Sequence, residues 1–295
     1  MPLDTAALGE SVGRRVQVLS RLPRRYQRPT SLISFLPAKA GAGATTLASC
    51  VGSAISKAHK TLLIDFDLTA GTAGFRHRAN CSHSIADILD NVEHLDETVW
   101  AQMVSHCRSL HVLSGRLTRE VEVSAAALDS LIEFLRTIYD VVIFDLSGNL
   151  EPYAVQIMRA CSRVFLVTTQ EVDCLHLGRQ RAEALREAGL ADRVEILMNR
   201  VHRSDYLGHT EVGDLLQFPV KAQFPNDYKS VQTSLREGTA LNPSSALSTA
   251  LQRFLPALLE EREAAAPRPR RFLEFVNLSI FSYKHQASLR SERWS

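Results

Sequence analysis

The sequence contains little cysteine and no long apolar run. Its five cysteines are spread over 295 residues and never form a C-x-x-C pair, so neither a disulfide framework nor a structural zinc site is expected. No stretch approaches the roughly 18 consecutive apolar residues that a membrane-spanning helix needs. The first 30 residues contain six arginines but lack the apolar segment of a signal peptide. We therefore expect a chain that stays in the reducing cytoplasm.

Motifs of several enzyme classes are also missing. The ten histidines show no metal-ligand spacing such as H-x-x-x-H, and no G-x-S-x-G motif of a serine hydrolase occurs. The composition, with 45% hydrophobic and 22% charged residues, supports a sizeable core. The net charge is only +2, yet both ends are basic and the middle is mildly acidic. Basic ends are usually solvated, but they can also contact nucleic acid or an anionic membrane.

Short β-branched runs alternate with segments of helical periodicity along most of the chain. Apolar runs typical of buried strands lie at residues 32–36, 61–67, 110–113, 141–146, 164–168, 194–199 and 220–224. Helical patterns lie at residues 46–57, 124–138, 173–188 and 245–263. This alternation predicts an α/β protein with a single doubly wound, mainly parallel β-sheet and helices on both faces.

The pattern divides the chain into one domain and two ends. We expect a single α/β domain over residues 31–263, preceded by a basic N-terminal extension at residues 1–30. The segment AAAPRPRR, residues 264–271, interrupts the periodicity with two prolines and three arginines. Residues 264–295 are therefore predicted to form a linker and a basic, apolar tail.

One strand-to-helix connection has the features of a phosphate-binding loop. The stretch SFLPAKAGAGATTLA, residues 34–48, offers Gly41 and Gly43 for a bent backbone whose N–H groups can point at an anion. The helix that follows adds the positive end of its dipole, and Thr45 supplies a hydroxyl of the kind that holds Mg²⁺. Ala44 stands where a P-loop has lysine. The alternative is a glycine-containing turn without a ligand.

Three aspartates lie at the ends of two predicted strands. Asp65 and Asp67 end the run TLLIDFD, and Asp145 lies near the end of the run YDVVIFDL. Because ligands of such sheets bind at the carboxyl ends of the strands, we expect these side chains near the loop. Asp65 and Asp145 are candidate magnesium ligands together with Thr45, and Asp67 is a candidate to orient a water. A single aspartate could merely cap a loop, but three in this order favour phosphate chemistry.

Taken together, these stretches resemble the MinD/ParA group of deviant Walker ATPases. The loop of that group reads x-K-G-G-x-G-K-[ST]-T, and its early lysine matches Lys39, whereas Ala40 and Ala44 depart from it. The CpaE/TadZ branch, which assembles type IV (Flp, tight-adherence) pili, often carries K-G-G-x-G-A-T-T. Similar to that branch are LLIDFDLTAGTAGF, SIADILDNVEHLDETV, LHVLSG, YDVVIFDLSGNLEP, VEILMNRV and FPNDYKSVQTSLREGTAL. The resemblance covers roughly residues 31–260. Its CpaE members commonly have a receiver-like N-terminal domain, which 30 residues cannot form, so a short form is implied.

The resemblance implies that the domain binds ATP and Mg²⁺. Its implied phosphate-binding residues are Lys39, Gly41, Ala42, Gly43, Ala44, Thr45 and Thr46. By resemblance, Lys39 serves the phosphates of a second subunit, while Asn199, Pro225 and Asp227 lie around the base. For Asn199 and Pro225, a role in merely ending strands is an equal alternative. Since one cation is missing at position 44, hydrolysis through Lys39 and Asp67 is expected to be slow or absent.

The implied partners are a second copy of the chain in its ATP state and the assembly proteins of a pilus or secretion system. The tail at residues 272–281, which follows three arginines, is a candidate for peripheral contact with a membrane. A docked helix or a partner-binding segment is the alternative. The expected location is cytoplasmic, including the inner membrane surface or a cell pole. Two other functions stay open, namely a scaffold that does not hydrolyse ATP and a ParA-like partition ATPase, although nucleic acid is not an expected partner.

Overall fold

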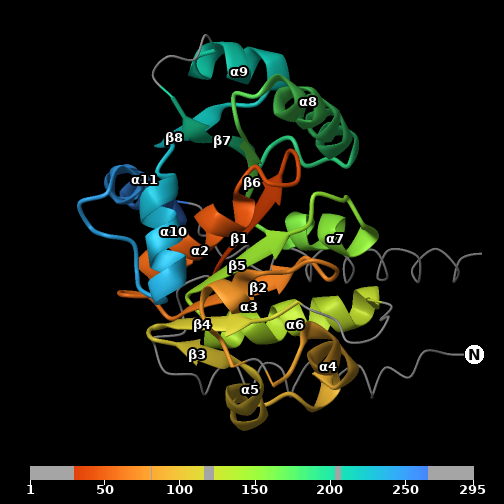
Figure 1. Ribbon diagram of the computed structural model, residues 1–295. Helices are drawn as coiled ribbons and strands as arrows, with labels where there is room; N and C mark the ends of the chain where they lie inside the picture. Colours follow the sequence, from red (N-terminus) through yellow and green to blue (C-terminus); the bar gives the residue numbers. More distant parts are fainter. Residues whose placement is uncertain (1–29, 81, 116–122, 203–206, 265–295) are drawn as a thin grey trace, which may run out of the picture.

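A computed structural model describes residues 30–80, 82–115, 123–202 and 207–264 of the chain (Figure 1). Apart from Thr30 and Ala264, the predicted basic extension and the predicted tail lie outside the described residues. The proposed membrane contact of the tail also lies outside them. No helix among the described residues has the length and apolar character needed to cross a bilayer.

An eight-stranded sheet organises the described residues, with the strand order β3-β4-β2-β5-β1-β6-β7-β8. Neighbouring strands are parallel except for β3 and β4, which are antiparallel. The strands are β1 (Ser31–Pro37), β2 (Thr61–Phe66), β3 (Ser105–Cys107), β4 (Leu110–Leu113), β5 (Val141–Leu146), β6 (Arg163–Thr168), β7 (Val194–Val201) and β8 (Val220–Pro225). All seven predicted strands are confirmed, as is the mainly parallel sheet.

Helices cover both faces of this sheet. Figure 1 shows α2 and α11 on one side, and α7 and α8 on the other. The α-helices are α2 (Ala44–Ile55), α3 (Ala73–Arg76), α4 (Ile85–Asp90), α5 (Glu97–Met103), α6 (Ala125–Ile138), α7 (Pro152–Ala160), α8 (Val172–Glu187), α9 (His209–Leu216), α10 (Tyr228–Glu237) and α11 (Ala246–Ala264), and a 3₁₀ turn, η2, spans Val92–His94. The four predicted helices correspond to α2, α6, α8 and α11.

The central strands are buried on both faces, which explains why their sequences are apolar nearly throughout. Every residue of β2 and of β5 is buried, and Phe66 packs against Phe144 with ring centroids 5.9 Å apart. The same burial applies to the two aspartates in these strands, Asp65 and Asp145. The sheet therefore places carboxylates inside the core at one edge, where they need a compensating interaction.

Several short elements have no clear pattern in the sequence. Strand β3 has only three residues and none of them is buried, so it lacks the apolar run that identifies a strand. Helix α10 likewise has no buried residue. The predicted N-cap of α6, Ser124, occupies the capping position but its side chain makes no capping hydrogen bond.

Candidate nucleotide-binding site

Three adjacent strands bring the predicted site residues to one edge of the sheet. β1 and β2 both pair with β5, and in this register Asp145 lies opposite Phe35 on one side and Asp65 on the other. The chain leaves β1 through residues 38–43 and enters α2 at Ala44. The loop and the acidic residues therefore meet at the carboxyl ends of the strands, as parallel sheets favour.

The loop is bent by two glycines in the left-handed region. Gly41 has φ 86° and Gly43 has φ 97°, conformations that residues with a Cβ rarely adopt. Gly43 is also the N-cap of α2, with no side-chain capping bond and no acidic residue in the first turn. The first N–H groups of α2 are thus left for an external anion, which a helix N-terminus binds well. Ala40 keeps a negative φ, so its Cβ causes no backbone strain.

Asn199, near the end of β7, contacts this loop directly. The side chain is 6% exposed, and its Nδ2 donates a hydrogen bond to the carbonyl oxygen of Ala42 at 2.8 Å. A Cβ added to Gly43 would lie only 2.2 Å from the same Nδ2. Gly43 is therefore required twice, for its φ and for the close approach of Asn199. The contact with the base that the sequence predicts for Asn199 stays a prediction.

Ala44 and Ala42 line the inner side of the loop. They are 4% and 3% exposed and belong to the hydrophobic core. The position that carries lysine in a P-loop is thus a buried methyl group. Positive charge at the loop must come from backbone N–H groups, the helix dipole and side chains outside the helix.

Asp65 fixes the segment that leads from β2 to α3. Its carboxylate accepts hydrogen bonds from the backbone N–H groups of Asp67 (3.1 Å) and Ala73 (2.8 Å). A Cβ on Gly71 would lie 2.6 Å from this carboxylate, so the loop is wrapped closely around it. Burial raises the pKa of Asp65 to about 6 despite these hydrogen bonds. Because both oxygens are engaged, Asp65 shapes the loop that carries Asp67, and its metal role stays a prediction.

Asp145 has no such support. The residue is 1% exposed, and neither carboxylate oxygen has a hydrogen-bond partner among the described residues. Burial raises the pKa of Asp145 well above its ordinary value, and the nearby Asp65 carboxylate adds to the rise. The nearby hydroxyl of Thr45 lowers the pKa of Asp145 and so counters part of this shift, although no hydrogen bond to the carboxylate is found among the described residues. A buried carboxylate without a partner calls for a ligand or an ion.

A Mg²⁺ ion fits this donor set. Magnesium prefers oxygen ligands and is usually held by one or two carboxylates together with substrate phosphates and water. Asp145 and Thr45 would hold the ion, and the loop N–H groups would hold the phosphates beside it. When bound, the ion supplies positive charge at a place where the chain itself has carboxylates.

Asp67 lies just after β2 and is only partly buried. Its Oδ1 accepts hydrogen bonds from the hydroxyl of Thr69 (3.0 Å) and from the backbone N–H groups of Thr69 (3.3 Å) and Ala70 (2.9 Å). Every hydrogen bond to this carboxylate from the described residues uses Oδ1. Oδ2 is therefore available to orient a water, the role that the sequence predicts.

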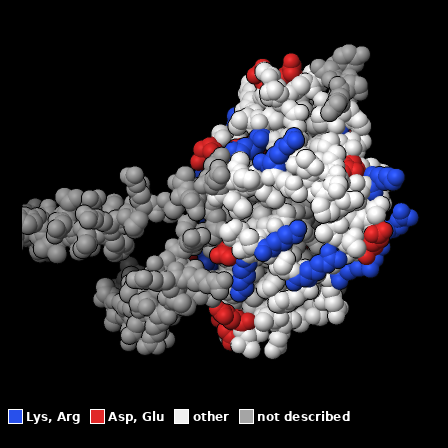
Figure 2. Space-filling view, turned by 90° about the vertical axis from the view of Figure 1, so that its left-hand side faces the viewer, with Lys and Arg blue, Asp and Glu red and all other residues white. Residues whose placement is uncertain are grey.

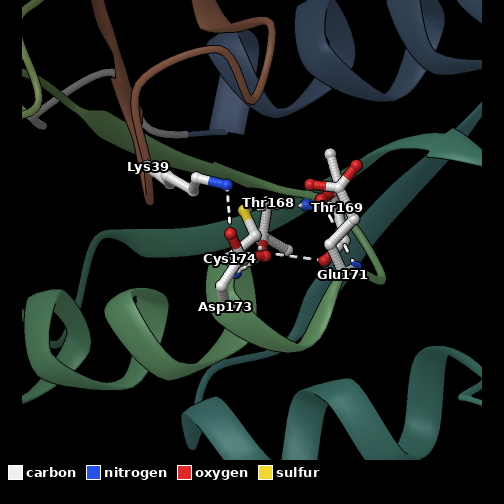
Figure 3. Close-up of polar contacts among 6 residues, drawn as sticks. All are labelled: Lys39, Thr168, Thr169, Glu171, Asp173 and Cys174. Carbon is white, nitrogen blue, oxygen red and sulfur yellow. Dashed lines mark hydrogen bonds and ion pairs between the residues drawn. The ribbon is translucent and has the colours of Figure 1, made fainter.

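Lys39 is paired within its own chain. Its ammonium group contacts the carboxylate of Asp173, in the first turn of α8 (Figure 3). The hydrogen bond raises the pKa of Lys39 and lowers that of Asp173. The pair is exposed, with 34% of the Lys39 side chain and 63% of the Asp173 side chain accessible. The sequence does not predict this partner, which is 134 residues away.

The start of α8 is itself fixed by a small network that Figure 3 shows. The backbone N–H of Thr169 donates to Sγ of Cys174 at 3.4 Å, and the N–H of Glu171 donates to the hydroxyl of Thr169 at 3.4 Å. The N–H of Cys174 donates to Asp173 at 2.9 Å. Asp173 is therefore presented on an ordered turn, and Lys39 is held by a fixed partner.

The remaining predicted residues lie farther along the same edge. Pro225 ends β8, and its register partner on β7 is Val201. Asp227 caps α10 through the N–H of Ser230 (3.3 Å) and also accepts from the N–H of Leu247 (3.1 Å) in α11. Asp227 thus ties two helix starts together, which the sequence does not predict. The contact of both residues with a base stays a prediction.

Comparison with known proteins agrees with this architecture. A family model, AAA_31, described as an AAA domain, matches residues 30–180. The septum site-determining protein MinD of Buchnera aphidicola subsp. Acyrthosiphon pisum (strain APS) is 24% identical over 249 residues, which cover 77% of this chain and 91% of that protein.

Two solved structures share the fold. A ParA family ATPase from Chlorobium tepidum TLS has a TM-score of 0.73 at 23% identity, covering 79% of this chain and 100% of that one. MinD complexed with Mg-ADP from Pyrococcus horikoshii OT3 has a TM-score of 0.65 at 21% identity, covering 78% of this chain and 96% of that one. The fold is therefore that of the MinD and ParA proteins.

The two loop glycines make a matched pair for a stability test. Gly41→Ala should cost about 1 kcal/mol, because a Cβ at positive φ is strained but meets no atom within 4 Å. Gly43→Ala should cost at least about 2 kcal/mol, because its Cβ must also displace Asn199 and break the hydrogen bond to Ala42. Urea unfolding measures both losses. Adding Asn199→Ala to Gly43→Ala should cost less than Asn199→Ala alone; equal losses at Gly41 and Gly43 would contradict the described geometry.

Proposed function

The chain belongs to the AAA_31 family of AAA domains, and from this premise we propose that it binds Mg-ATP and acts as an ATP-dependent dimer that positions a larger assembly. One observation carries the proposal, namely the buried carboxylate of Asp145, which has no partner among the described residues. Folding around such a group is costly, and a cation bound beside the carboxylate would offset the cost. Asp145 lies beside a helix N-terminus that offers its N–H groups to an anion.

Asp145→Asn separates a ligand role from a structural role. The variant should be more stable than the parent without ligand, by about 1 kcal/mol or more at pH 7.5, since it removes an unpaired buried charge. Folding raises the pKa of Asp145, so the parent loses stability as pH rises and the gain should nearly vanish at pH 4. The same variant should lose most of its affinity for Mg-AMPPNP in calorimetry. A destabilised variant that binds nucleotide normally would contradict the proposal.

Dimerisation would require Lys39 to leave its partner in the same chain. The resemblance assigns Lys39 to the phosphates of a second subunit, whereas in the described chain it pairs with Asp173. The two positions exclude each other, so the ion pair opposes the dimer. Because the pair is exposed and screened by water, its opposition to the dimer is modest.

Substitutions at the two ends of this ion pair should therefore act in opposite directions. With Mg-AMPPNP, Lys39→Ala should stay monomeric, whereas Asp173→Asn should dimerise up to about fivefold more readily than the parent. Light scattering over a range of protein concentrations measures the dimer. Glu183→Gln is the control, because it breaks another exposed ion pair on α8, with Arg179. If Lys39→Ala dimerises like the parent, Lys39 does not act across the interface.

Turnover distinguishes a slow ATPase from a scaffold that only holds nucleotide. Asp67→Asn keeps the oxygen that accepts from Thr69 and Ala70 but removes the charge, so hydrolysis should fall while the loop stays folded. Ala44→Lys should raise the rate by at least about tenfold, because it restores a cation near the transferred phosphoryl group. Phosphate release under saturating Mg-ATP measures both. Unchanged rates in both variants, with nucleotide bound, would favour the scaffold.

For the assembly itself, we propose a type IV (Flp/Tad) pilus or a related secretion system. The support is the resemblance of the loop and of the strand-end segments to the CpaE/TadZ branch, which includes the alanine at position 44. A ParA-like partition role is the second candidate, because a ParA family ATPase shares the fold. The same proposal includes assembly proteins of the pilus or secretion system as partners, a cytoplasmic location at the membrane or a pole, and contact of the tail with lipid.

A further inference from the structure

A cavity of about 450 Å³ lies beside α2, on the face of the sheet that carries α10 and α11. It is bounded by α2, the turn between β3 and β4, and the segment that joins α10 to α11. Of the residues predicted to bind nucleotide, only Thr46 reaches its wall. The cavity is thus largely separate from the phosphate loop, and its size falls within the range of small-molecule sites, roughly 300–1,000 Å³.

One wall of this cavity is basic. Lys57, Arg76, Arg78 and Arg108 line it, and no aspartate or glutamate is found among the described lining residues. Figure 2 shows the face of the molecule that carries α10, with lysine and arginine side chains across its middle and acidic ones mainly toward its edges. Since the middle of the chain is mildly acidic overall, this concentration of positive charge is local. It favours an anionic ligand.

Three polar atoms of the lining residues lack partners. Oγ of Ser49, Nε of Arg76 and Nε2 of His77 are buried and have no hydrogen-bond partner among the described residues. Ser49 is only 7% exposed. Burial lowers the pKa of His77 to about 4, so this imidazole is neutral at physiological pH. Buried polar atoms nearly always have partners, and three that lack one occur among the residues that line this cavity.

The opposite wall is apolar. Val231 and Leu235 of α10 line the cavity together with Leu251 and Leu255 of α11. Helix α10 buries no residue completely, although Val231 and Leu235 are partly covered. These side chains would be covered further by a ligand with an apolar body, and burial of that body would add to its affinity.

We propose that this cavity is a binding site for a small organic phosphate. The phosphate would pair with Arg76 and accept one hydrogen bond from the hydroxyl of Ser49, and the apolar body would lie against the leucines of α11. Guanidinium and hydroxyl groups are strong donors to phosphate oxygens. A free nucleotide or a lipid headgroup would each satisfy this chemistry. The proposal does not depend on nucleotide binding at the phosphate loop.

The test uses 1-naphthyl phosphate, which joins an aromatic body to a phosphate. Calorimetry on the full chain, with and without 1 mM Mg-AMPPNP, should show binding in both conditions. Arg76→Met should weaken it about tenfold or more, because a charge-assisted hydrogen bond is lost. Lys57→Glu should weaken it at least about threefold, since Lys57 is exposed and makes no hydrogen bond or ion pair with the described residues.

Lys229→Glu is the matched control, because Lys229 is an exposed lysine on α10 that does not line the cavity. It should bind the probe like the parent. Arg78 and Arg108 are unsuitable, since they donate to the backbone carbonyls of Arg236 (2.6 Å) and Gly238 (2.9 Å) and hold the wall itself. Thermal melting of each variant checks that it is folded.

A second arm identifies the source of the phosphate. Vesicles of phosphatidylcholine with and without phosphatidylglycerol are sedimented with the protein. In one outcome the protein binds the anionic vesicles, and Arg76→Met and Lys57→Glu abolish this binding whereas Lys229→Glu does not. That outcome would assign the site to a lipid headgroup. Binding of the probe alone would assign it to a soluble phosphate. If neither ligand binds, or if Lys229→Glu has the same effect as Lys57→Glu, the proposal is wrong.

Discussion

The burial of Asp145 at the end of β5 constrains the whole site. Its carboxylate is enclosed between β1 and β2, next to Asp65, with no partner among the described residues. Because the strands are buried on both faces, the carboxylate is shielded from bulk solvent, and Asp145 is 1% exposed. A sequence could remove this cost with an apolar residue, yet the aspartate is present. The buried carboxylate therefore lowers the stability of the fold at a place where a bound metal ion and phosphate would offset the loss. Functional sites are often destabilised in this way.

The loop above this carboxylate is built without its usual cation. Ala44 is buried in the core, so phosphate binding in the proposed function would rest on backbone geometry. That geometry depends on Asn199 and on Gly41 and Gly43, which both have positive φ. Such a loop can bind an anion and position it. Accelerating the breakage of a phosphoanhydride bond also needs positive charge on the leaving and transferred groups. In the proposed function, nucleotide binding and turnover are therefore separate properties, which suits a protein that would signal its nucleotide state by assembling.

The sequence predicts the strands and the loop because their patterns are local. An apolar run such as β5 is recognisable wherever it lies, and Gly41 and Gly43 are informative because few other residues tolerate their φ. The partners of the site residues are not local. Lys39 and Asp173 are 134 residues apart, and Asp173 looks like an ordinary acidic residue of a helix first turn. Arg76 gives no signal at all, because it lies in a four-residue helix without a periodic pattern.

Helix α3 connects the two regions of interest with very little chain. The N–H of Ala73, its first residue, donates to Asp65, and Arg76, its last, lines the basic cavity. Burial lowers the pKa of Arg76, and the nearby Cys50 and Asp145 oppose part of this shift. One short turn therefore lies between Asp65 of the candidate metal site and the guanidinium of the cavity. The effect of Asp145 on the pKa of Arg76 shows that the two regions lie within electrostatic reach of each other.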